Sequence, residues 1–386
     1  MKKNIKVALL VDEFFGGAGT AFGGYGFLAR NYICKYIPCE DISIDVLLKR
    51  GKSKYFSKHY IVDNTNVYLL PNNYHFMQKF LHKKNYDIYL SIELTNPSAD
   101  IIQKDREFYR KQLILWIQDP RPKYEWNEIE TVKLFPEKNY YYQPTYNLVN
   151  RLFNKGQVSF ISQGYFLNQK AIDLYGLLQH TPIQYLPNPV EIDDSFDFSS
   201  YPKKNMIIFL GRIESVKRGW LFCEIAKNMP EYEFYVLGKT TREKEKNSEV
   251  LEKYLTLPNL HFVGHVEGKE KEKYLKDAKI LVNTSIHEAL PVSFLEALSY
   301  GTLLVSNRNP ENLTSKFGIW TGDIYGDGFD KINLYIDAIR TLITDNKKRE
   351  KLGEYAIKYI KNIHNIPNFV ENLRKCIRDN FNNLHP

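Results

Sequence analysis

The sequence predicts an α/β protein of two domains, each built on a parallel sheet with helices on both faces. Short apolar runs alternate with amphipathic segments of helical period, which is typical of such sheets. The 386 residues exceed one ordinary hydrophobic core. Residues 187–205 are rich in Pro, Ser and Asp and have no helical period, so they form the expected linker between two series of elements.

In the first series each apolar run predicts a strand, and the periodic segments between the runs predict helices. The expected strands are residues 6–11, 42–48, 67–70, 87–91, 113–117, 158–161 and 184–186. The expected helices are residues 25–37, 75–84, 97–109 and 165–175.

The second series begins directly after the linker. Its expected strands are residues 206–210, 233–237, 261–263, 279–282 and 303–306. Its expected helices are residues 220–227, 269–278 and 291–300, followed by amphipathic helices over 332–343, 352–363 and 369–381. The apolar stripe of the last helix needs a partner, which the first domain could provide. We therefore predict domains at 1–190 and 191–366, with 367–386 as a C-terminal helix that packs back on the first domain.

The composition is that of a soluble globular protein, with 43% hydrophobic and 25% charged residues. No stretch approaches the roughly 20 apolar residues that span a bilayer, and the N-terminus leads directly into a strand, so we expect a cytoplasmic location. The four cysteines form no Cys-x-x-Cys pair, which favours reduced thiols.

The formal net charge of +8 is concentrated in the first half of the chain. Residues 1–190 hold 24 Lys/Arg and 17 Asp/Glu, a net +7, whereas residues 191–386 hold 29 and 28, a net +1. A basic half could attract a lipid diphosphate, an anionic membrane surface or nucleic acid. A lysine-rich solvated surface is the plain alternative.

The strongest candidate site is the stretch 284–302, with Glu288 in a loop and Glu296 about one turn inside the next helix. Ligands bind where parallel strands end, and helix N-termini there offer N–H groups to anions. The carboxylates would accept hydrogen bonds from hydroxyl groups. A sugar nucleotide fits such a site, because its phosphates lie between two ends that carry hydroxyl groups. Taken singly, Glu296 could be an acid favoured by the helix dipole and Glu288 a solvated loop residue.

Two cations follow the first strand of the same series. Arg212 and Lys217 lie in a short loop between a strand and a helix, where they could clamp a diphosphate by charge and hydrogen bonding. Surface cations are common. The carboxylates expected at the same sheet edge support the interpretation of this pair as part of a binding site.

Two loops of the first series are also candidates. Residues 15–24 form a glycine-rich turn that lets the backbone approach a ligand, but no Gly-Lys-Ser/Thr follows that would support phosphoryl transfer. The loop 116–122 presents Gln118, Asp119 and Arg121 at a strand end, with a turn-capping role as the alternative for Asp119. The histidines and acidic loops lack the spacing of zinc or calcium sites, so no metal is expected.

These residues together resemble the retaining glycosyltransferases of family 4, whose GT-B fold has two facing Rossmann-like domains. The resemblance covers residues 158–306 well and the first 150 residues loosely. It rests on Gly211-Arg212…Lys217, on Ser285-x-x-Glu288-Ala-Leu-Pro…Glu296-Ala-Leu-x-x-Gly301, on Phe160-Ile161-Ser162, and on Pro187-Asn188-Pro189-Val190-Glu191-Ile192-Asp193.

The resemblance implies a role for each matching side chain. Arg212 and Lys217 would hold the donor diphosphate, Glu288 would bind hydroxyl groups of the transferred sugar, and Glu296 would bind the ribose. Together with Asp119, the first three of these would be the catalytic residues. The second domain would bind the nucleotide sugar and the first domain the acceptor, without a metal or cofactor.

The resemblance also assigns backbone positions. The N–H groups of Leu290, Val292 and Ser293 would help at the sugar and the phosphates, whereas Pro291 has none to offer. Gly23 and Gly24 match the family's glycine pair near the phosphates and the acceptor.

Two positions depart from the family pattern. The family often presents His-Asp where this chain has Gln118-Asp119, and glutamine cannot act as a general base near neutral pH. Ala289 stands where a glycine usually follows the first glutamate.

The implied function is retaining transfer of a hexosyl or deoxyhexosyl group from a nucleoside-diphosphate sugar, with UDP first and GDP or dTDP as alternatives. The acceptor would be a glycan or a lipid-linked glycan in surface polysaccharide or glycoconjugate biosynthesis, which would bring the protein to the inner face of the cell membrane. Three alternatives stay open: a non-catalytic sugar-nucleotide-binding protein of the same fold, a sugar-nucleotide epimerase and, from the basic first half, a nucleic-acid-binding protein.

Overall fold

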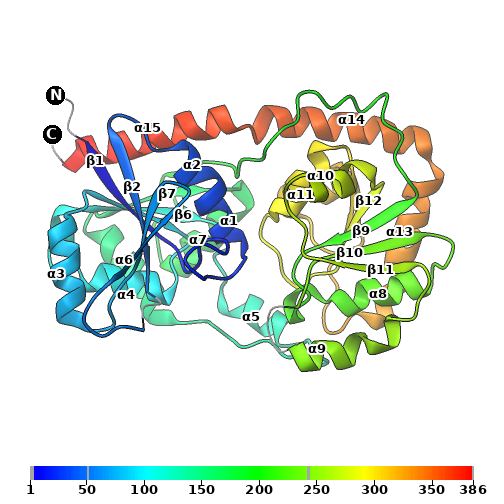
Figure 1. The fold of residues 1–386 in the computed structure, drawn as a ribbon, viewed down its shortest axis with the longest axis horizontal. Helices are drawn as coiled ribbons and strands as arrows, with labels where there is room; N and C mark the ends of the chain where they lie inside the picture. The colour runs from blue at the N-terminus through cyan, green and yellow to red at the C-terminus, as the bar shows by residue number, and fades with distance from the viewer. Residues whose placement is uncertain (1–3, 50–51, 241–243, 385–386) are drawn as a thin grey trace. The chain divides into compact units, whose positions relative to one another are not determined.

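The chain forms two compact units in the computed structural model, which describes residues 4–49, 52–240 and 244–384. Unit 1 comprises Met1–Pro120, Tyr142–Pro189 and Ile366–Pro386, and unit 2 comprises Arg121–Tyr141 and Val190–Asn365. Each unit holds one sheet with helices packed on it (Figure 1). The predicted two-domain α/β fold class is therefore confirmed.

Within the described residues, unit 1 has an eight-stranded sheet in the order β3-β4-β2-β1-β5-β6-β7-β8. Its strands are β1 (Ile5–Leu10), β2 (Ile42–Leu48), β3 (Lys58–Val62), β4 (Thr65–Leu69), β5 (Ile88–Ile92), β6 (Gln112–Ile117), β7 (Val158–Ser162) and β8 (Ile183–Tyr185). The described pairs are parallel apart from β3, which runs antiparallel to β4 at the sheet edge. We did not predict β3, whose side chains are almost all exposed although it ends in the apolar residues Tyr60, Ile61 and Val62.

The helices of unit 1 come from distant parts of the sequence. They are α1 (Gly24–Leu28), a π-helical turn (Ala29–Ile33), α2 (Cys34–Tyr36), α3 (Tyr74–Lys84), α4 (Asn96–Lys104), α6 (Gln143–Asn154), α7 (Asn168–Tyr175) and α15 (Ile366–Leu384). The C-terminal helix α15 lies beside β5 and β6 of the unit 1 sheet (Figure 1). Its Phe369 ring packs 5.5 Å from that of Trp116, and Arg374 donates to the carbonyl oxygen of Ile37. The predicted return of this helix to the first domain is confirmed.

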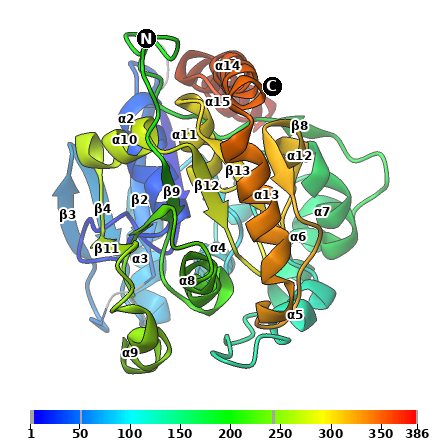
Figure 2. The ribbon, with the colours of Figure 1, turned by 90° about the vertical axis from the view of Figure 1, so that its right-hand side faces the viewer.

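Unit 2 has, among its described residues, a six-stranded parallel sheet in the order β11-β10-β9-β12-β13-β14. The strands are β9 (Met206–Leu210), β10 (Glu233–Leu237), β11 (Leu260–Gly264), β12 (Ile280–Asn283), β13 (Leu303–Ser306) and β14 (Gly318–Trp320). Its helices include α8 (Gly219–Lys227), α9 (Lys244–Leu251), α10 (Gly268–Asp277), α11 (Val292–Ser299), α12 (Leu313–Lys316), α13 (Ile332–Thr344) and α14 (Asn346–Ile363). In Figure 2 the helix α13 lies beside β13, and α8 lies below β9 and β12.

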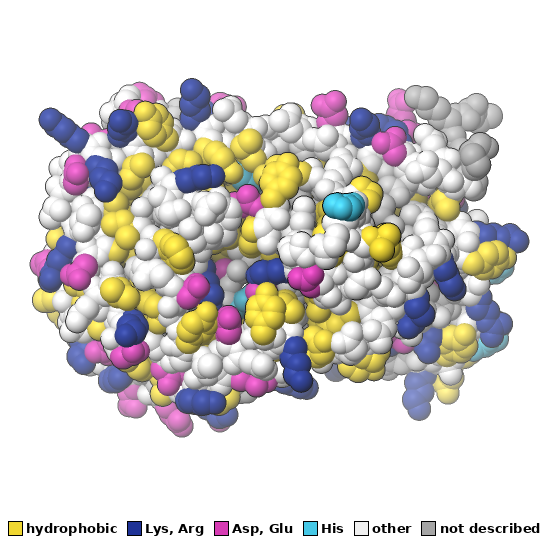
Figure 3. All heavy atoms as spheres, turned by 180° about the vertical axis from the view of Figure 1, so that it is seen from behind, with side chains coloured by type: hydrophobic (Ala, Val, Ile, Leu, Met, Phe, Trp, Pro, Cys, Tyr) yellow, Lys and Arg dark blue, Asp and Glu magenta, His cyan; other side chains and the backbone are white. Residues whose placement is uncertain are grey.

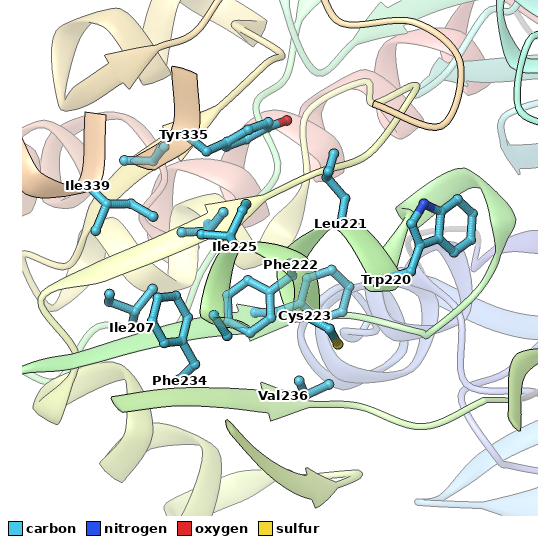
Figure 4. Packing of buried hydrophobic residues seen from close by; sticks show 14 of the residues in the cluster. Ile207, Trp220, Leu221, Phe222, Cys223, Ile225, Phe234, Val236, Tyr335 and Ile339 are labelled. Carbon is cyan, nitrogen blue, oxygen red and sulfur yellow. The ribbon is translucent and has the colours of Figure 1, made fainter. Parts of the chain in front are cut away.

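The core of unit 2 lies between this sheet and the helices α8 and α13. Phe222 and Ile225 of α8 pack among Phe234 of β10 and Tyr335 and Ile339 of α13 (Figure 4). Among the described residues, no helix of either unit combines the length and the apolar composition needed to cross a membrane.

Residues 121–141 belong to unit 2, whereas the predicted boundary placed all of residues 1–190 in the first domain. The segment contains α5 (Lys123–Ile129), which we did not predict. Its apolar side chains are buried in the same cluster as those of α8: Trp126, Ile129, Val132 and Phe135. A short helix with few apolar residues does not reveal from its own sequence which of two cores it joins, so contacts with unit 2 decided its place.

Candidate active site

The predicted donor-binding residues lie in the loops that follow β9 and β12. These strands are parallel neighbours, so their C-terminal ends meet at one edge of the sheet of unit 2. Several hydrogen bonds join the loops. Among them, Ile286 N donates to the carbonyl oxygen of Val216 at 2.8 Å, and Thr284 Oγ1 donates to that of Lys217 at 2.9 Å. The structure therefore brings the cationic loop and the loop of Glu288 together.

Lys217 and Glu288 form a close ion pair at this edge. Lys217 Nζ donates to Glu288 Oε1 at 2.5 Å, and Asn283 Nδ2 and Ser285 Oγ donate to the same oxygen at 3.0 and 2.6 Å. Burial alone would raise the pKa of Glu288, but the charge of Lys217 and these hydrogen bonds outweigh it and hold the pKa below its ordinary value. Glu288 is therefore an ionised carboxylate in a buried position.

Arg212 and Glu296 contact other partners in this structure. Arg212 Nη1 lies 3.5 Å from Glu214 Oε2. Glu296 Oε1 accepts a hydrogen bond from Lys271 Nζ of α10 at 2.6 Å. A ligand at either residue would have to share or replace these contacts.

The start of α11 provides the backbone positions that we predicted. Val292 and Ser293 are its first two residues, Pro291 precedes it with extended backbone angles, and Leu290 is buried. The first N–H groups of a helix have no carbonyl partner one turn earlier. Glu296 lies beyond the first turn, so its position is not explained by the helix dipole.

Arg218, which we did not single out from the sequence, anchors the Glu288 loop. Its side chain is fully buried, and burial lowers its pKa to about 10. Nε donates to the carbonyl oxygen of Thr284 at 2.6 Å and Nη1 to that of Gly326 at 2.9 Å. The residue adopts left-handed backbone angles (φ 47°, ψ 48°), which are strained for a residue with a Cβ.

Arg308 holds the same loop from the other side. It follows β13, and its Nη2 donates to the carbonyl oxygen of Ile286 while Nη1 lies 3.2 Å from Asp323. Helix α5 adds two carboxylates here, because Glu128 lies 3.7 Å from Arg308 and Glu125 lies 3.8 Å from His287. Sequence reasoning missed these contacts, since α5 comes from a segment distant in sequence.

In unit 1, the glycine-rich turn leads into α1 at the predicted glycine pair. A Cβ at Gly23 would lie 1.5 Å from Glu13 Oε1, so the end of the Glu13 side chain fills the space beside this glycine. A Cβ at Gly24 would meet no heavy atom of the described residues within 4 Å. Of the two glycines, only Gly24 therefore leaves room that a ligand could use.

Gln118, at the end of β6, is buried in a network of amide side chains. Its Nε2 donates to Asn188 Oδ1 at 2.9 Å, Asn188 Nδ2 donates to Gln163 Oε1 at 2.5 Å, and Gln163 Nε2 donates to the carbonyl oxygen of Gln118 at 2.5 Å. These bonds tie the end of β6 to the end of β7 and to the start of the linker. Gln118 therefore has a structural role in place of the exposed one that we expected.

Glu93, a second residue that we missed, fixes the backbone of Asp119. It follows β5, is buried with left-handed backbone angles (φ 50°), and its Oε2 accepts from the N–H groups of Gln118 and Asp119 at 3.0 and 2.7 Å. Its Oε1 accepts from Tyr175 Oη at 2.5 Å, and burial raises its pKa. Asp119 itself is partly exposed at this strand end. The one signal in the sequence was an acid directly after a predicted strand.

Comparison with known proteins identifies the domain that contains the donor-side residues. A family model described as "Glycosyl transferases group 1" matches residues 191–359, which lie within unit 2. Sulfoquinovosyl transferase SQD2 of Arabidopsis thaliana is 27% identical over 162 residues, which span 40% of this chain and 30% of that protein. This part of the chain is thus similar to glycosyltransferase group 1 domains, and the match covers less than half of the chain.

Solved structures resemble the whole chain. Sucrose-phosphate synthase from Thermosynechococcus elongatus has a TM-score of 0.74 at 12% identity, with 98% of this chain and 99% of that one covered. Anabaena Alr3699/HepE in complex with UDP-glucose has a TM-score of 0.68 at 12% identity, covering 97% and 100%. The pneumococcal O-GlcNAc transferase GtfA in complex with UDP and GlcNAc has a TM-score of 0.67 at 12% identity, covering 98% and 99%. These likenesses confirm the predicted GT-B fold class.

Proposed function

We propose that the chain transfers a hexosyl or deoxyhexosyl group from a nucleoside-diphosphate sugar to an acceptor hydroxyl group, with retention of configuration and without a metal. The observation that carries this proposal is the Lys217–Glu288 pair, which lies inside the matched glycosyltransferase domain. A fixed ammonium beside a fixed carboxylate suits a ligand in which a diphosphate adjoins sugar hydroxyl groups.

The cationic loop would bind the donor diphosphate. An ammonium has three N–H donors, so Lys217 can keep its bond to Glu288 and direct the other two at phosphate oxygens. Arg212 would exchange its long contact with Glu214 for the diphosphate. These cations, with the free N–H groups at the start of α11, would stabilise the negative charge that grows on the departing diphosphate.

The two carboxylates would bind the hydroxyl groups at either end of the donor. All three hydrogen bonds recorded for Glu288 within the described residues reach Oε1, which leaves Oε2 to accept from a hydroxyl group of the transferred sugar. Glu296, kept charged by Lys271, would accept from the ribose. We propose UDP as the first nucleotide to test, with GDP and dTDP as alternatives.

The chemical step would break the bond between the anomeric carbon and the diphosphate oxygen. The acceptor oxygen would form its new bond on the same face of the sugar. Its proton would pass to Asp119 or to a phosphate oxygen of the donor, because the neutral amide of Gln118 cannot accept it near neutral pH.

The acceptor that we propose is a glycan or a lipid-linked glycan of surface polysaccharide or glycoconjugate biosynthesis. Its use would place the protein in the cytoplasm at the inner face of the cell membrane. The basic excess of residues 1–190 supports this choice, because a lipid diphosphate is anionic.

A donor screen tests the proposal. Thermal shift against UDP-, GDP- and dTDP-sugars should reveal one nucleotide class, since a ligand at 100 times its dissociation constant stabilises a protein by about 2.7 kcal/mol. Release of the diphosphate, even by slow hydrolysis, should follow with that donor in the presence of a chelator. Lys217→Ala should abolish release, and Lys253→Ala, at an exposed lysine of the same unit, should not.

Two alternatives give different results in the same assay. A non-catalytic binding protein, which the burial of Gln118 favours weakly, would show the thermal shift without release of nucleotide. An epimerase would convert the sugar without an acceptor. Either result would replace the transferase proposal.

A further inference from the structure

Residues 52–85 form an unusually basic edge of unit 1. The stretch contains six lysines and a single acid, Asp63, which is already paired with Arg30 at 2.7 Å. It builds the edge strand β3, its neighbour β4 and the helix α3. Lys52, Lys54, Lys58, Lys79 and Lys83 are exposed, whereas Lys84 turns inward to Asp45. Lys58 precedes His59 by one residue in β3, so it lies on the opposite face of that strand from His59.

Large hydrophobic side chains lie exposed among these lysines. Ile61 is 70% exposed, Phe56 64%, Tyr55 59% and Tyr74 43%. Isolated exposed hydrophobic residues are normal. Several of them clustered with lysines indicate an interaction surface. Figure 3 shows hydrophobic side chains between those of Lys and Arg at the right-hand edge, the side on which α3 lies in this view.

The segment before β3 is held against the start of α3. The backbone N–H groups of Asn72 and Asn73 donate to the carbonyl oxygens of Ser53 and Lys54, which ties the segment before β3 to the start of α3. The Tyr55 ring packs edge-on against Phe76 of α3 at 5.3 Å.

The edge strand presents one of its faces to the same side. The His59 ring stacks on Tyr68 of β4 at 4.6 Å, and Tyr68 contacts Phe80 of α3. Ile61 is two residues beyond His59, so it lies on the same face of β3 as His59.

We propose that a surface formed by Lys52, Lys54, Lys79 and Lys83 with Tyr55, Phe56, Ile61 and Tyr74 docks unit 1 on an anionic lipid bilayer. Lysine ammonium groups are attracted to the negative surface of such a membrane, while tyrosine, phenylalanine and isoleucine enter its interface. A nucleic acid fits less well, because residues 52–85 contain no arginine for bidentate phosphate contacts and expose an aliphatic side chain, Ile61, most of all.

The proposal adds a docking surface to the proposed function and does not depend on it. Vesicle binding needs neither donor nor acceptor. The docking proposal can therefore be wrong while the transferase proposal holds, and the transferase proposal can be wrong while the docking proposal holds. If both hold, docking would bring unit 1 to the membrane where a lipid-linked acceptor resides.

The test is flotation of the full chain with vesicles of phosphatidylcholine alone or mixed in equal parts with phosphatidylglycerol. Binding is expected only to the mixed vesicles and should weaken as salt is added. Replacing Lys52, Lys54, Lys79 and Lys83 by Gln should reduce binding by more than about 100-fold, since each basic residue near an anionic membrane contributes roughly fivefold, or about 1 kcal/mol. Phe56→Ser with Ile61→Ser should reduce the binding that persists at high salt.

Two matched control variants distinguish binding by this surface from binding that depends only on the net charge or on any exposed hydrophobic residue. Lys347, Lys348, Lys351 and Lys358 of α14 are equally exposed, and their change to Gln removes the same charge. Leu178 (72% exposed) and Leu255 (61%) match Ile61 and Phe56 for the change to Ser. Equal losses in test and control variants would overturn the proposal. So would heparin or single-stranded DNA that binds the surface and displaces the vesicles completely.

Discussion

The ammonium group of Lys217 makes the largest contribution to keeping Glu288 ionised. The carboxylate is buried, and Lys217 provides the cation that keeps its pKa low. Removing one partner of a buried pair is costly because the other charge stays uncompensated. This pair can therefore be tested for stability and for activity in the same variants.

We expect Lys217→Met to lower the free energy of unfolding by about 2 kcal/mol, less than for a fully buried pair because the lysine is partly exposed. Adding Glu288→Gln should recover most of this loss, since the orphaned charge is then gone. Urea denaturation of the four proteins in a double-mutant cycle measures the coupling. Both single variants should lose about 100-fold or more in turnover. Additive stability losses would contradict the pairing.

The pH dependence of stability should change sign at this residue. In the native protein the folded-state pKa of Glu288 lies below the unfolded value, so its contribution is present above the ordinary glutamate pKa and is lost as pH falls through the folded pKa. In Lys217→Met, only the hydrogen bonds from Asn283 and Ser285 still oppose burial, and the folded pKa should rise above the unfolded value. That variant should therefore be stabilised, relative to pH 7, on acidification toward the ordinary pKa. Parallel pH profiles from chemical denaturation would contradict this account.

Arg218 allows the effect of its guanidinium group to be separated from backbone strain. Arg218→Ala and Arg218→Gly both remove the hydrogen bonds to Thr284 and Gly326, but only glycine adopts the left-handed backbone angles without strain. The glycine variant should be more stable by about 1 kcal/mol. Both should lose activity equally, on the order of 10- to 100-fold, because the Glu288 loop is no longer held in place. Thermal unfolding and donor kinetics measure the two effects, and a glycine variant with full activity would exclude a positioning role.

At the scale of elements, α5 is a helix that could not be predicted from the sequence. Most predicted strands and helices agree with the structure to within a few residues, because buried strands and amphipathic helices record their burial in their own periodicity. The edge strand β3 is exposed and α5 is short, so neither shows a hydrophobic periodicity that would reveal it in the sequence. The domain to which residues 121–141 belong follows from contacts with unit 2, which no local pattern encodes.

The assignment of α5 predicts an unusual effect of a core mutation. Ile129→Ala should destabilise unit 2 by about 3 kcal/mol, although residue 129 lies among residues that we expected in the first domain. Hydrogen exchange read by mass spectrometry should show faster exchange in α8 and little change in α7. Val149→Ala, at a buried position of α6 in unit 1, should show the reverse. Faster exchange in α7 after Ile129→Ala would contradict the division into units.

At the scale of the whole molecule, the proposed donor site should make nucleotide protection specific to one unit. Saturating UDP, if it is the right nucleotide, should slow hydrogen exchange in the loop 211–218 and at the start of α11, since a bound ligand raises the free energy of local opening. Amides of α3 and α4 in unit 1 should be unaffected. Lys217→Ala should show no protection at the same UDP concentration. Protection confined to unit 1 would place the nucleotide elsewhere.

The sequence by itself determined the alternation of strands and helices, the two parallel sheets and the loops that carry Arg212, Lys217 and Glu288. It did so because hydrophobic periodicity and chain polarity fix which loops leave the C-terminal ends of parallel strands. Only the tertiary structure decided the partners: Lys271 for Glu296, the buried amides for Gln118, and the cores that receive α5 and α15. A pattern along the chain records that a side chain is buried, whereas the group that it meets depends on which distant segments the fold brings together.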